Sequence, residues 1–320
     1  MLYTRRELAT LVIAAIPAAR LAPAARVSAF QAKPDSKVRG VTIGMNVPYN
    51  FGSRTMPVDQ IIQNCVQLGI SGVELRTQPV EAFLGVPEQL VAPGQGGAQG
   101  APATPEQEAA RKARAEELRK WRLSVPMEKV RALRKQFDDA GVLVEIVKVD
   151  GIFDMTDDAV DYEFALAKNL GARAISTEIA VANTKRLGQF ADKHKMMVGY
   201  HGHATTSAAD FETVFAYAAH NGANLDIGHF VAGQNTSPVP FIKQHHARIT
   251  HIHVKDRKMN NGPNVPFGEG DTPIKEVLQL IRDNKWNIQA TIEFEYPVPQ
   301  GSDRMTEIKK SIDYCRAALA

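Results

Sequence analysis

Acidic, imidazole and cationic side chains in this chain gather where short apolar runs end. They are Glu74, Arg76, Lys148, Glu178, His201, His203, Asp226, His229, His251, His253, Lys255, Asp256, Glu293 and Glu295. If these runs are parallel strands, their carboxyl ends meet at one face, and residues far apart in sequence come together. Three carboxylates and an imidazole around a dry, empty centre would repel, and a divalent cation neutralises that repulsion. We therefore expect Glu178, Asp226, His253 and Glu293 to bind one divalent metal ion.

The spacing of these residues indicates which way they point. Side chains two apart on a strand share a face. This applies to three pairs: His201 and His203, His251 and His253, and Glu293 and Glu295. An acid that faced the covering helices would be buried without a partner at a high cost in free energy, so we expect the pairs to face inward. The alternative is purely structural, with salt bridges between Glu74 and Arg76 and between Lys255 and Asp256.

The proposed ligands also restrict the metal. An oxygen-rich set with one imidazole favours Mn²⁺, Co²⁺ or Mg²⁺, and Zn²⁺ remains an alternative.

The elements that must position these residues alternate along the chain. We expect strands at Val41–Met45, Gly72–Leu75, Leu143–Val147, Ala174–Thr177, Met197–Tyr200, Ala223–Ile227, Ile249–Val254 and Ile288–Phe294. Helical spacing covers Val58–Leu68, Met127–Ala140, Asp157–Leu170, Asn183–His194, Ala208–Ala219, Val239–His246, Pro273–Asp283 and Arg304–Leu319. Helix ends are predicted at Gly69, Gly141, Gly171 and Gly222. Eight repeats predict a single α/β domain, a (β/α)₈ TIM barrel over residues 38–320. A doubly wound open sheet is the alternative, although no G-x-G-x-x-G follows the first strand.

Residues 85–125 interrupt this pattern after the second strand. Gly85–Ala103 is rich in Gly, Pro, Ala and Gln, whereas Thr104–Arg122 is charged and favours a helix. Barrel loops at this point overhang the site, so Glu106–Trp121 is a candidate lid or subunit contact. A disordered surface insertion is the alternative for the Gly/Pro-rich half.

Residues 1–29 are expected to be a targeting segment. Arg5 and Arg6 precede a mild apolar stretch, and small residues follow at Val27-Ser28-Ala29. This resembles a twin-arginine export signal and predicts a periplasmic protein; a retained amphipathic extension is the alternative. Arg20 and two prolines interrupt the stretch, so a stable membrane span is not expected.

Composition restricts the partners further. A net charge of +3 over 320 residues, without a dense basic stripe, gives no sign of a nucleic-acid partner. Cys65 and Cys315 are the only cysteines, and we expect two buried thiols, with a disulfide between them as the alternative.

Four motifs carry a resemblance to a known family. They are Ser176-Thr177-Glu178, Leu225-Asp226-Ile227-Gly228-His229, His251-Ile252-His253-Val254-Lys255-Asp256 and Ile292-Glu293-Phe294-Glu295. In this order the chain resembles the xylose isomerase-like TIM-barrel superfamily, and within it the sugar phosphate isomerase/epimerase group that includes D-tagatose 3-epimerase and inosose dehydratase. The resemblance covers the chain from Val41 to its end, apart from the insertion.

The resemblance implies roles for individual residues. One metal would be bound by Glu178, Asp226, His253 and Glu293, with Glu295 as the alternative to Glu293. The expected substrate contacts are His203, His229, Lys255, His201, Arg76 and Glu295. Endonuclease IV, a three-zinc relative, needs further histidines after the second and third strands, where this chain has other residues.

The expected reaction is proton transfer next to the carbonyl of a sugar or cyclic polyol, through an ene-diolate. Glu178 and Glu293 would act as acid and base, giving a sugar isomerase or epimerase with a small carbohydrate substrate. One alternative is a dehydratase or lyase on keto-sugars or keto-glycosides. Another is a non-catalytic, metal-dependent carbohydrate-binding barrel. Formation of a homo-oligomer through the outer helices is common in the resembled group.

Overall fold

The structure is a computed structural model, and it describes residues 33–91 and 104–320. The predicted export segment at residues 1–29 lies outside the described residues, as does most of the Gly/Pro-rich stretch.

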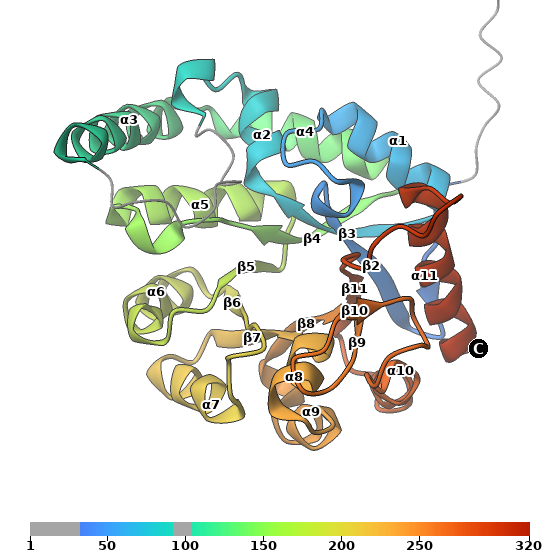
Figure 1. The fold of residues 1–320 in the computed structure, drawn as a ribbon. Coiled ribbons are helices and arrows are strands. Elements are labelled where there is room, and N and C mark those ends of the chain that lie inside the picture. The colour runs from blue at the N-terminus through green and yellow to red at the C-terminus, as the bar shows by residue number, and fades with distance from the viewer. Residues whose placement is uncertain (1–32, 92–103) are drawn as a thin grey trace, which may run out of the picture. The chain divides into compact units, whose positions relative to one another are not determined.

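Eight parallel strands close into a barrel, which confirms the predicted fold (Figure 1). The strands are β2 (Val41–Val47), β3 (Gly72–Arg76), β4 (Leu143–Lys148), β5 (Ala174–Glu178), β6 (Met197–His201), β7 (Asn221–Asp226), β8 (Ile249–Val254) and β11 (Gln289–Ile292). Closure comes from the last strand, because β11 pairs in parallel with β2, with Ala290 opposite Ile43. All eight strands therefore present their carboxyl ends at one mouth.

Helices surround this barrel on every side (Figure 1). Those predicted from the sequence are α1 (Val58–Leu68), α4 (Met127–Ala140), α5 (Asp157–Leu170), α6 (Val181–His194), α7 (Ala208–Tyr217), α9 (Val239–His245), α10 (Ile274–Asp283) and α11 (Arg304–Leu319). Gly69, Gly141 and Gly171 end their helices with φ of 70°, 76° and 87°, a conformation that glycine adopts without strain. Gly222 was wrongly predicted to end a helix: α7 stops at Tyr217, and Gly222 lies within β7.

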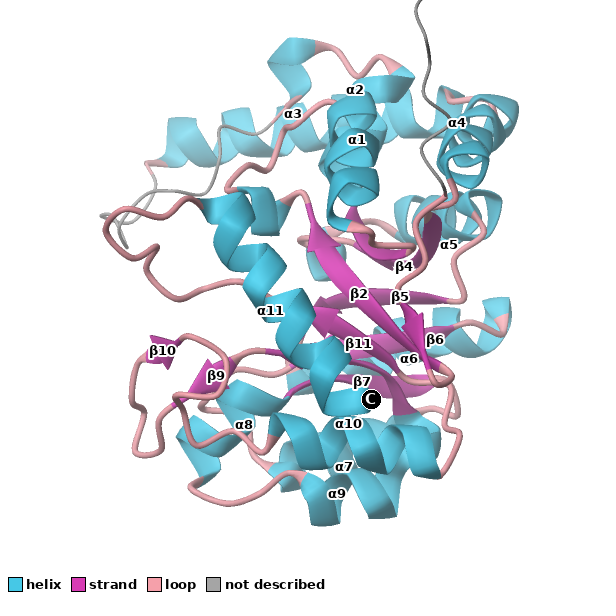
Figure 2. Ribbon diagram, turned by 90° about the vertical axis from the view of Figure 1, so that its right-hand side faces the viewer, coloured by secondary structure: helices cyan, strands magenta, loops and turns pink. Residues whose placement is uncertain are grey.

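Several short elements were not predicted, and most follow strand ends. They are β1 (Lys37–Val38), α2 (Thr77–Leu84), α8 (Ile227–Gln234), β9 (Asp256–Arg257) and β10 (Asn264–Val265). The antiparallel pair β9–β10 lies at the left of Figure 2, and β9 follows β8 in the chain. Apart from β1, these elements shape the mouth of the barrel.

The described part of the insertion is the helix α3 (Pro105–Ser124). It begins at a capping box in which Thr104 and Gln107 satisfy each other's backbone amides. Near its carboxyl end, Arg122 forms ion pairs with two other helices, at 2.6 Å to Glu81 of α2 and 3.5 Å to Glu163 of α5. The described half of the insertion is thus an ordered helix on the barrel exterior. A role as lid or subunit contact stays a prediction.

The two cysteines are part of the hydrophobic core. Cys65 of α1 and Cys315 of α11 are buried and form no disulfide, and burial raises the pKa of each thiol to about 12. The prediction of two buried thiols agrees with this arrangement.

No helix among residues 33–91 and 104–320 combines the length and the apolar character that crossing a bilayer requires.

Candidate metal centre and active site

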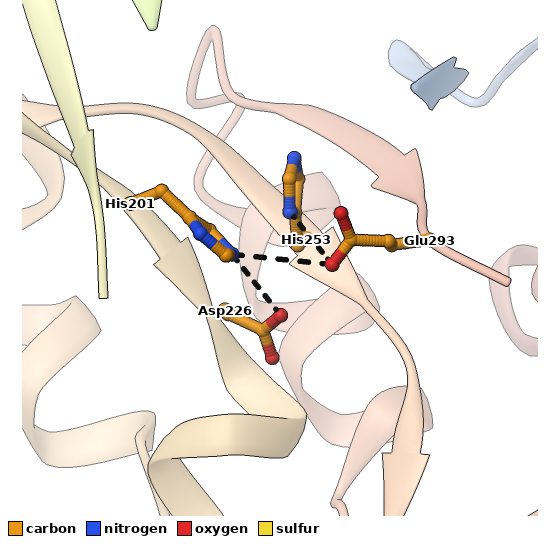
Figure 3. A group of neighbouring side chains, drawn as sticks. All are labelled: His201, Asp226, His253 and Glu293. Atoms are coloured by element: carbon orange, nitrogen blue, oxygen red, sulfur yellow. Dashed lines mark hydrogen bonds and ion pairs between the residues drawn. The ribbon is translucent and has the colours of Figure 1, made fainter. Parts of the chain in front are cut away.

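Four buried side chains from neighbouring strands converge at the mouth of the barrel. They are His201 at the end of β6, Asp226 at the end of β7, His253 on β8 and Glu293 just after β11. One ligand atom from each lies within 4.8 Å of the others, and Figure 3 shows the two rings and two carboxylates pointing toward one another. We call these four residues the metal-candidate cluster.

The contacts within this cluster leave one ring nitrogen without a partner. Nδ1 of His253 is buried, lies 3.2 Å from Oε2 of Glu293 and forms no hydrogen bond within the described residues, whereas Oε2 of Glu293 is 2.6 Å from Nζ of Lys255. Nε2 of His201 lies 3.4 Å from Oδ2 of Asp226 and 3.9 Å from Oε2 of Glu293. Two imidazoles and two carboxylates are a common donor set for a divalent transition metal. The residues therefore fit a metal ion.

A lysine ammonium lies against the same carboxylates. Nζ of Lys255 is 2.9 Å from Asp226, 2.6 Å from Glu293 and 2.6 Å from Glu295. Burial would lower the pKa of Lys255, but the three carboxylates outweigh it and raise that pKa well above its usual range. Burial would likewise raise the pKa of Asp226 and of Glu293, but Lys255 and the nearby histidines lower both. The cluster thus contains ionised carboxylates held by an internal cation.

Glu178, predicted as the fourth ligand, lies beside this cluster rather than in it. Oε1 is 2.6 Å from Nζ of Lys148, while Oε2 is 3.0 Å from Nδ1 of His201 and 2.8 Å from Nε2 of His203. Its side chain is 49% exposed. Burial would raise the pKa of Glu178, but Lys148 and the two histidines lower it far below its usual range. His201, a member of the cluster, therefore links the exposed, ionised carboxylate of Glu178 to the buried carboxylate of Asp226.

A second buried group lies deeper in the barrel, around Glu74. Its Oε2 is 2.6 Å from Nε2 of His253, and its Oε1 is 3.4 Å from Nε2 of His251. Burial would lower the pKa of His253, but Glu293 and Glu74 raise it to about 10. Burial lowers the pKa of His251 to about 4 against the effect of Glu74. His253 consequently uses one ring nitrogen for Glu74 and turns the other toward Glu293.

The purely structural pairings considered for the sequence do not form. Arg76 is 2.7 Å from Asp150 instead of pairing with Glu74. Asp256 accepts hydrogen bonds from the backbone amides of the loop that follows β10, at Gly268, Gly270 and Thr272. Lys255 therefore pairs with Asp226, Glu293 and Glu295 and not with Asp256.

Of the predicted substrate contacts, His201 is part of the metal-candidate cluster, and His203, His229, Lys255 and Glu295 lie around it. His203 is 54% exposed, and the hydrogen bond that it donates to Glu178 raises its pKa. Burial lowers the pKa of His229 to about 4, and its ring nitrogens face Arg257 at 2.6 Å and Lys255 at 3.2 Å.

The other two, Glu295 and Arg76, are linked through one tyrosine. The hydroxyl of Tyr49 donates to Oε1 of Glu295 at 2.8 Å, and the guanidinium of Arg76 lies 5.1 Å from the centre of the Tyr49 ring. Glu295 thus belongs to the mouth, whereas Arg76 reaches it only through Tyr49.

Sequence reasoning missed several polar residues of the mouth. Asn46 of β2 donates to Oε1 of Glu293 at 3.0 Å, and Asn224 of β7 lies 3.0 Å from Nε2 of His253. Spacing held a usable signal, since Asn224 precedes Asp226 by two and so shares its face. Tyr49 and Arg257 come from short elements after β2 and β8, and the sequence held no comparable signal for them.

Comparison with protein families finds a match over the carboxyl-terminal part of the chain, to the superfamily that the motifs suggested. Residues 173–318 match the family described as xylose isomerase-like TIM barrel. This stretch contains every residue of the metal-candidate cluster, together with Glu178 and His203. No curated protein sequence matches the chain.

Solved structures share the fold at low sequence identity. A xylose isomerase domain protein of Alicyclobacillus acidocaldarius has a TM-score of 0.59 at 13% identity, covering 87% of this chain and 99% of the other. One of Planctomyces limnophilus has 0.57 at 15%, covering 88% and 97%. The probable 3-DHS dehydratase AsbF of Bacillus anthracis has 0.57 at 14%, covering 87% and 97%. At these identities the likeness establishes the fold alone.

Proposed function

We propose that this protein is a metal-dependent enzyme that removes a proton from the carbon next to the carbonyl of a sugar or cyclic polyol. Asp226, His253 and Glu293 would supply three metal ligands. The fourth would come from one of two residues that contact each other, His201 or Glu178. A metal ion held there would supply Lewis-acid polarisation of the carbonyl. The resemblance to sugar isomerases supports this class of substrate. The convergence of the metal-candidate cluster, with Nδ1 of His253 buried and without a hydrogen bond in the described part of the chain, supports the metal.

The observation that carries the proposal is the position of Glu178. This carboxylate is half exposed at the mouth, next to the buried cluster, and it is ionised at neutral pH. An ionised, accessible carboxylate that is fixed in place can accept a proton from a substrate carbon. Lys148 and His203 hold its two oxygens in position, so Glu178 is the base.

The charge state of Glu293 bears on the stereochemical outcome. Since His253 and Lys255 hold its pKa well below the usual range, Glu293 is a poor donor of a proton to the opposite face. Proton removal and return by the same carboxylate, as in an aldose–ketose isomerisation, therefore suits the site better than a two-base epimerisation.

A second candidate reaction is elimination of a β-hydroxyl or an aglycone from the same ene-diolate. His203 favours it, because a half-exposed imidazole with a raised pKa, 2.8 Å from the base, can protonate a departing oxygen. The similarity to a protein described as a probable 3-DHS dehydratase also supports this candidate.

Deuterium incorporation tests the proposal. The protein is stripped with a chelator, reloaded with Mn²⁺, Co²⁺, Mg²⁺ or Zn²⁺, and incubated with a ketose panel in D₂O under proton NMR. We expect metal-dependent exchange at carbon, and about 10²–10⁴-fold slower exchange in Glu178→Gln. Glu212→Gln is the matched control, since Glu212 is also an exposed acid paired with a histidine, His245, at 3.3 Å.

The product spectrum separates the candidate functions. Carbonyl migration indicates an isomerase, and loss of water or aglycone indicates a lyase. Saturable sugar binding without any exchange would instead identify a carbohydrate-binding barrel, and undiminished exchange in Glu178→Gln would remove Glu178 as the base.

We also propose that the twin-arginine segment at residues 1–29 directs export of the folded protein. Its support is the paired arginines before the apolar stretch, and amino-terminal sequencing of periplasmic and cytoplasmic fractions tests it.

A further inference from the structure

A cavity of about 490 Å³ opens beside the metal-candidate cluster rather than over it. Its walls come from the loop after β2, from β10 and from the start of α11. The side chains that matter here are Tyr49, Ser53, Arg54, Asn264, Glu295 and Arg304. A volume of this size is in the usual range for small-molecule sites.

Two guanidinium groups line this cavity. Neither Arg54 nor Arg304 forms an ion pair within residues 33–91 and 104–320, and Arg54 is exposed. Arg304 is held in place, because its Nη1 donates to the carbonyl of Asn50 at 3.1 Å and its guanidinium lies 5.0 Å from the centre of the Phe294 ring. Positive charge therefore faces the cavity without a counter-ion from the described chain.

The one acid of the cavity is already engaged. Oε1 of Glu295 accepts from Tyr49 at 2.8 Å, and its Oε2 is 2.6 Å from Lys255 and 3.4 Å from the amide of Asn264. The hydrogen-bonding groups left for a ligand are consequently mainly donors. Such a lining suits a group rich in acceptors and negatively charged.

The cavity and the metal-candidate cluster share one boundary. Glu295 lines the cavity, and Lys255 joins Glu295 to Asp226 and Glu293 of the cluster. A group bound in the cavity therefore lies one ion pair, Lys255–Glu295, away from the cluster.

We propose that the Arg54–Arg304 cavity binds an anionic group, a carboxylate or a phosphate, carried by the same sugar that reacts at the metal centre. This inference rests on the proposed function and narrows its substrate class to acidic sugar derivatives. Bidentate recognition of planar carboxylate or of phosphate oxygens is what guanidinium groups do best.

Calorimetric titration tests the inference with three probes: glucose, glucuronate and glucose 6-phosphate. We expect glucuronate, glucose 6-phosphate or both to bind on the order of tenfold more tightly than glucose to the wild-type protein. Arg54→Gln should abolish that preference and leave glucose binding unchanged. Arg39→Gln is the matched control, because Arg39 is an exposed arginine in the turn between β1 and β2, at the amino end of the barrel.

The outcomes also identify the anion and separate this inference from the proposed function. Preference for glucuronate indicates a carboxylate, and preference for glucose 6-phosphate indicates a phosphate. Equal affinity for all three probes, or an equal loss in Arg54→Gln and Arg39→Gln, would overturn the inference. The titration needs no turnover, so failure of deuterium exchange counts against the proposed reaction and leaves the anion preference to be judged on its own.

Discussion

Nε2 of His253 lies 2.6 Å from Oε2 of Glu74, and both side chains are fully buried inside the barrel. A carboxylate that engages one ring nitrogen of a histidine fixes the tautomer and orients the other nitrogen toward a metal. The other nitrogen of His253 is the one that faces Glu293. Glu74 is thus a positioning residue for the metal-candidate cluster.

Loss of this carboxylate should weaken metal binding without removing a ligand. We expect Glu74→Gln to lower the affinity for Mn²⁺ or Co²⁺ by about 10–100-fold, measured by calorimetric titration. Glu145→Gln is the matched control, because Glu145 lies on the adjacent strand β4 and forms its own ion pair with Arg173 at 3.0 Å. Equal affinities in the two variants would show that Glu74 does not orient the ligand.

The identity of the fourth ligand can be decided by paired substitutions. His201 already lies within the metal-candidate cluster, whereas Lys148 and His203 hold Glu178 at the rim. We therefore expect His201→Gln to reduce bound metal, measured by elemental analysis, more than Glu178→Gln does. The opposite ranking would return the ligand role to Glu178, as the sequence predicted.

Removal of the internal cation should destabilise the metal-free protein. Lys255→Met leaves Asp226, Glu293 and Glu295 without their shared positive charge. Breaking a buried ion pair from one side costs about 3–5 kcal/mol, so the free energy of unfolding should fall by that order. Denaturant titration measures this, and addition of metal should restore more stability to the variant than to the wild type. A variant as stable as the wild type without metal would contradict the assignment.

The contact between α3 and α5 should make stability depend on pH. Burial raises the pKa of Glu163 from 4.5 to about 7. Arg122 lowers this pKa and Glu81 raises it, and burial is the largest effect. The folded state therefore favours the protonated form of Glu163. Its contribution to the free energy of unfolding is fully present below pH 4.5 and is lost as the pH rises to 7. At 1.36 kcal/mol per pKa unit, the loss is about 3 kcal/mol.

Glu163→Gln should remove that loss. We expect its free energy of unfolding to fall less than that of the wild type between pH 5 and 8, measured by denaturant titration at each pH. Glu116→Gln, on the exposed side of α3, should follow the wild-type curve. A Glu163→Gln curve parallel to the wild type would show that Glu163 is ionised throughout.

Local patterns in the sequence were enough for the barrel and for most of the cluster. Apolar periodicity and helix-ending glycines predicted α1, α4, α5 and α11 with their observed bounds. Placement at strand ends identified Asp226, His253 and Glu293. Each of these signals lies within one strand–helix unit, where local backbone preferences decide the structure.

What escaped prediction depends on contacts between units. The position of Glu178 is decided by Lys148 on a neighbouring strand, and that of Arg76 by Asp150 in the loop after the neighbouring strand β4. The short elements α8, β9 and β10 are ordered by contacts at the mouth, and their own sequences carry little periodicity. Such side-chain choices among distant partners cannot be derived from spacing alone.

The lysine among the acids of the mouth also bears on the order of assembly. Because the chain brings its own ammonium group to Asp226, Glu293 and Glu295, these acids can be enclosed before any inorganic ion arrives. Loading then becomes an exchange in which the incoming ion competes with a tethered amine, so maturation of the centre can follow folding in time.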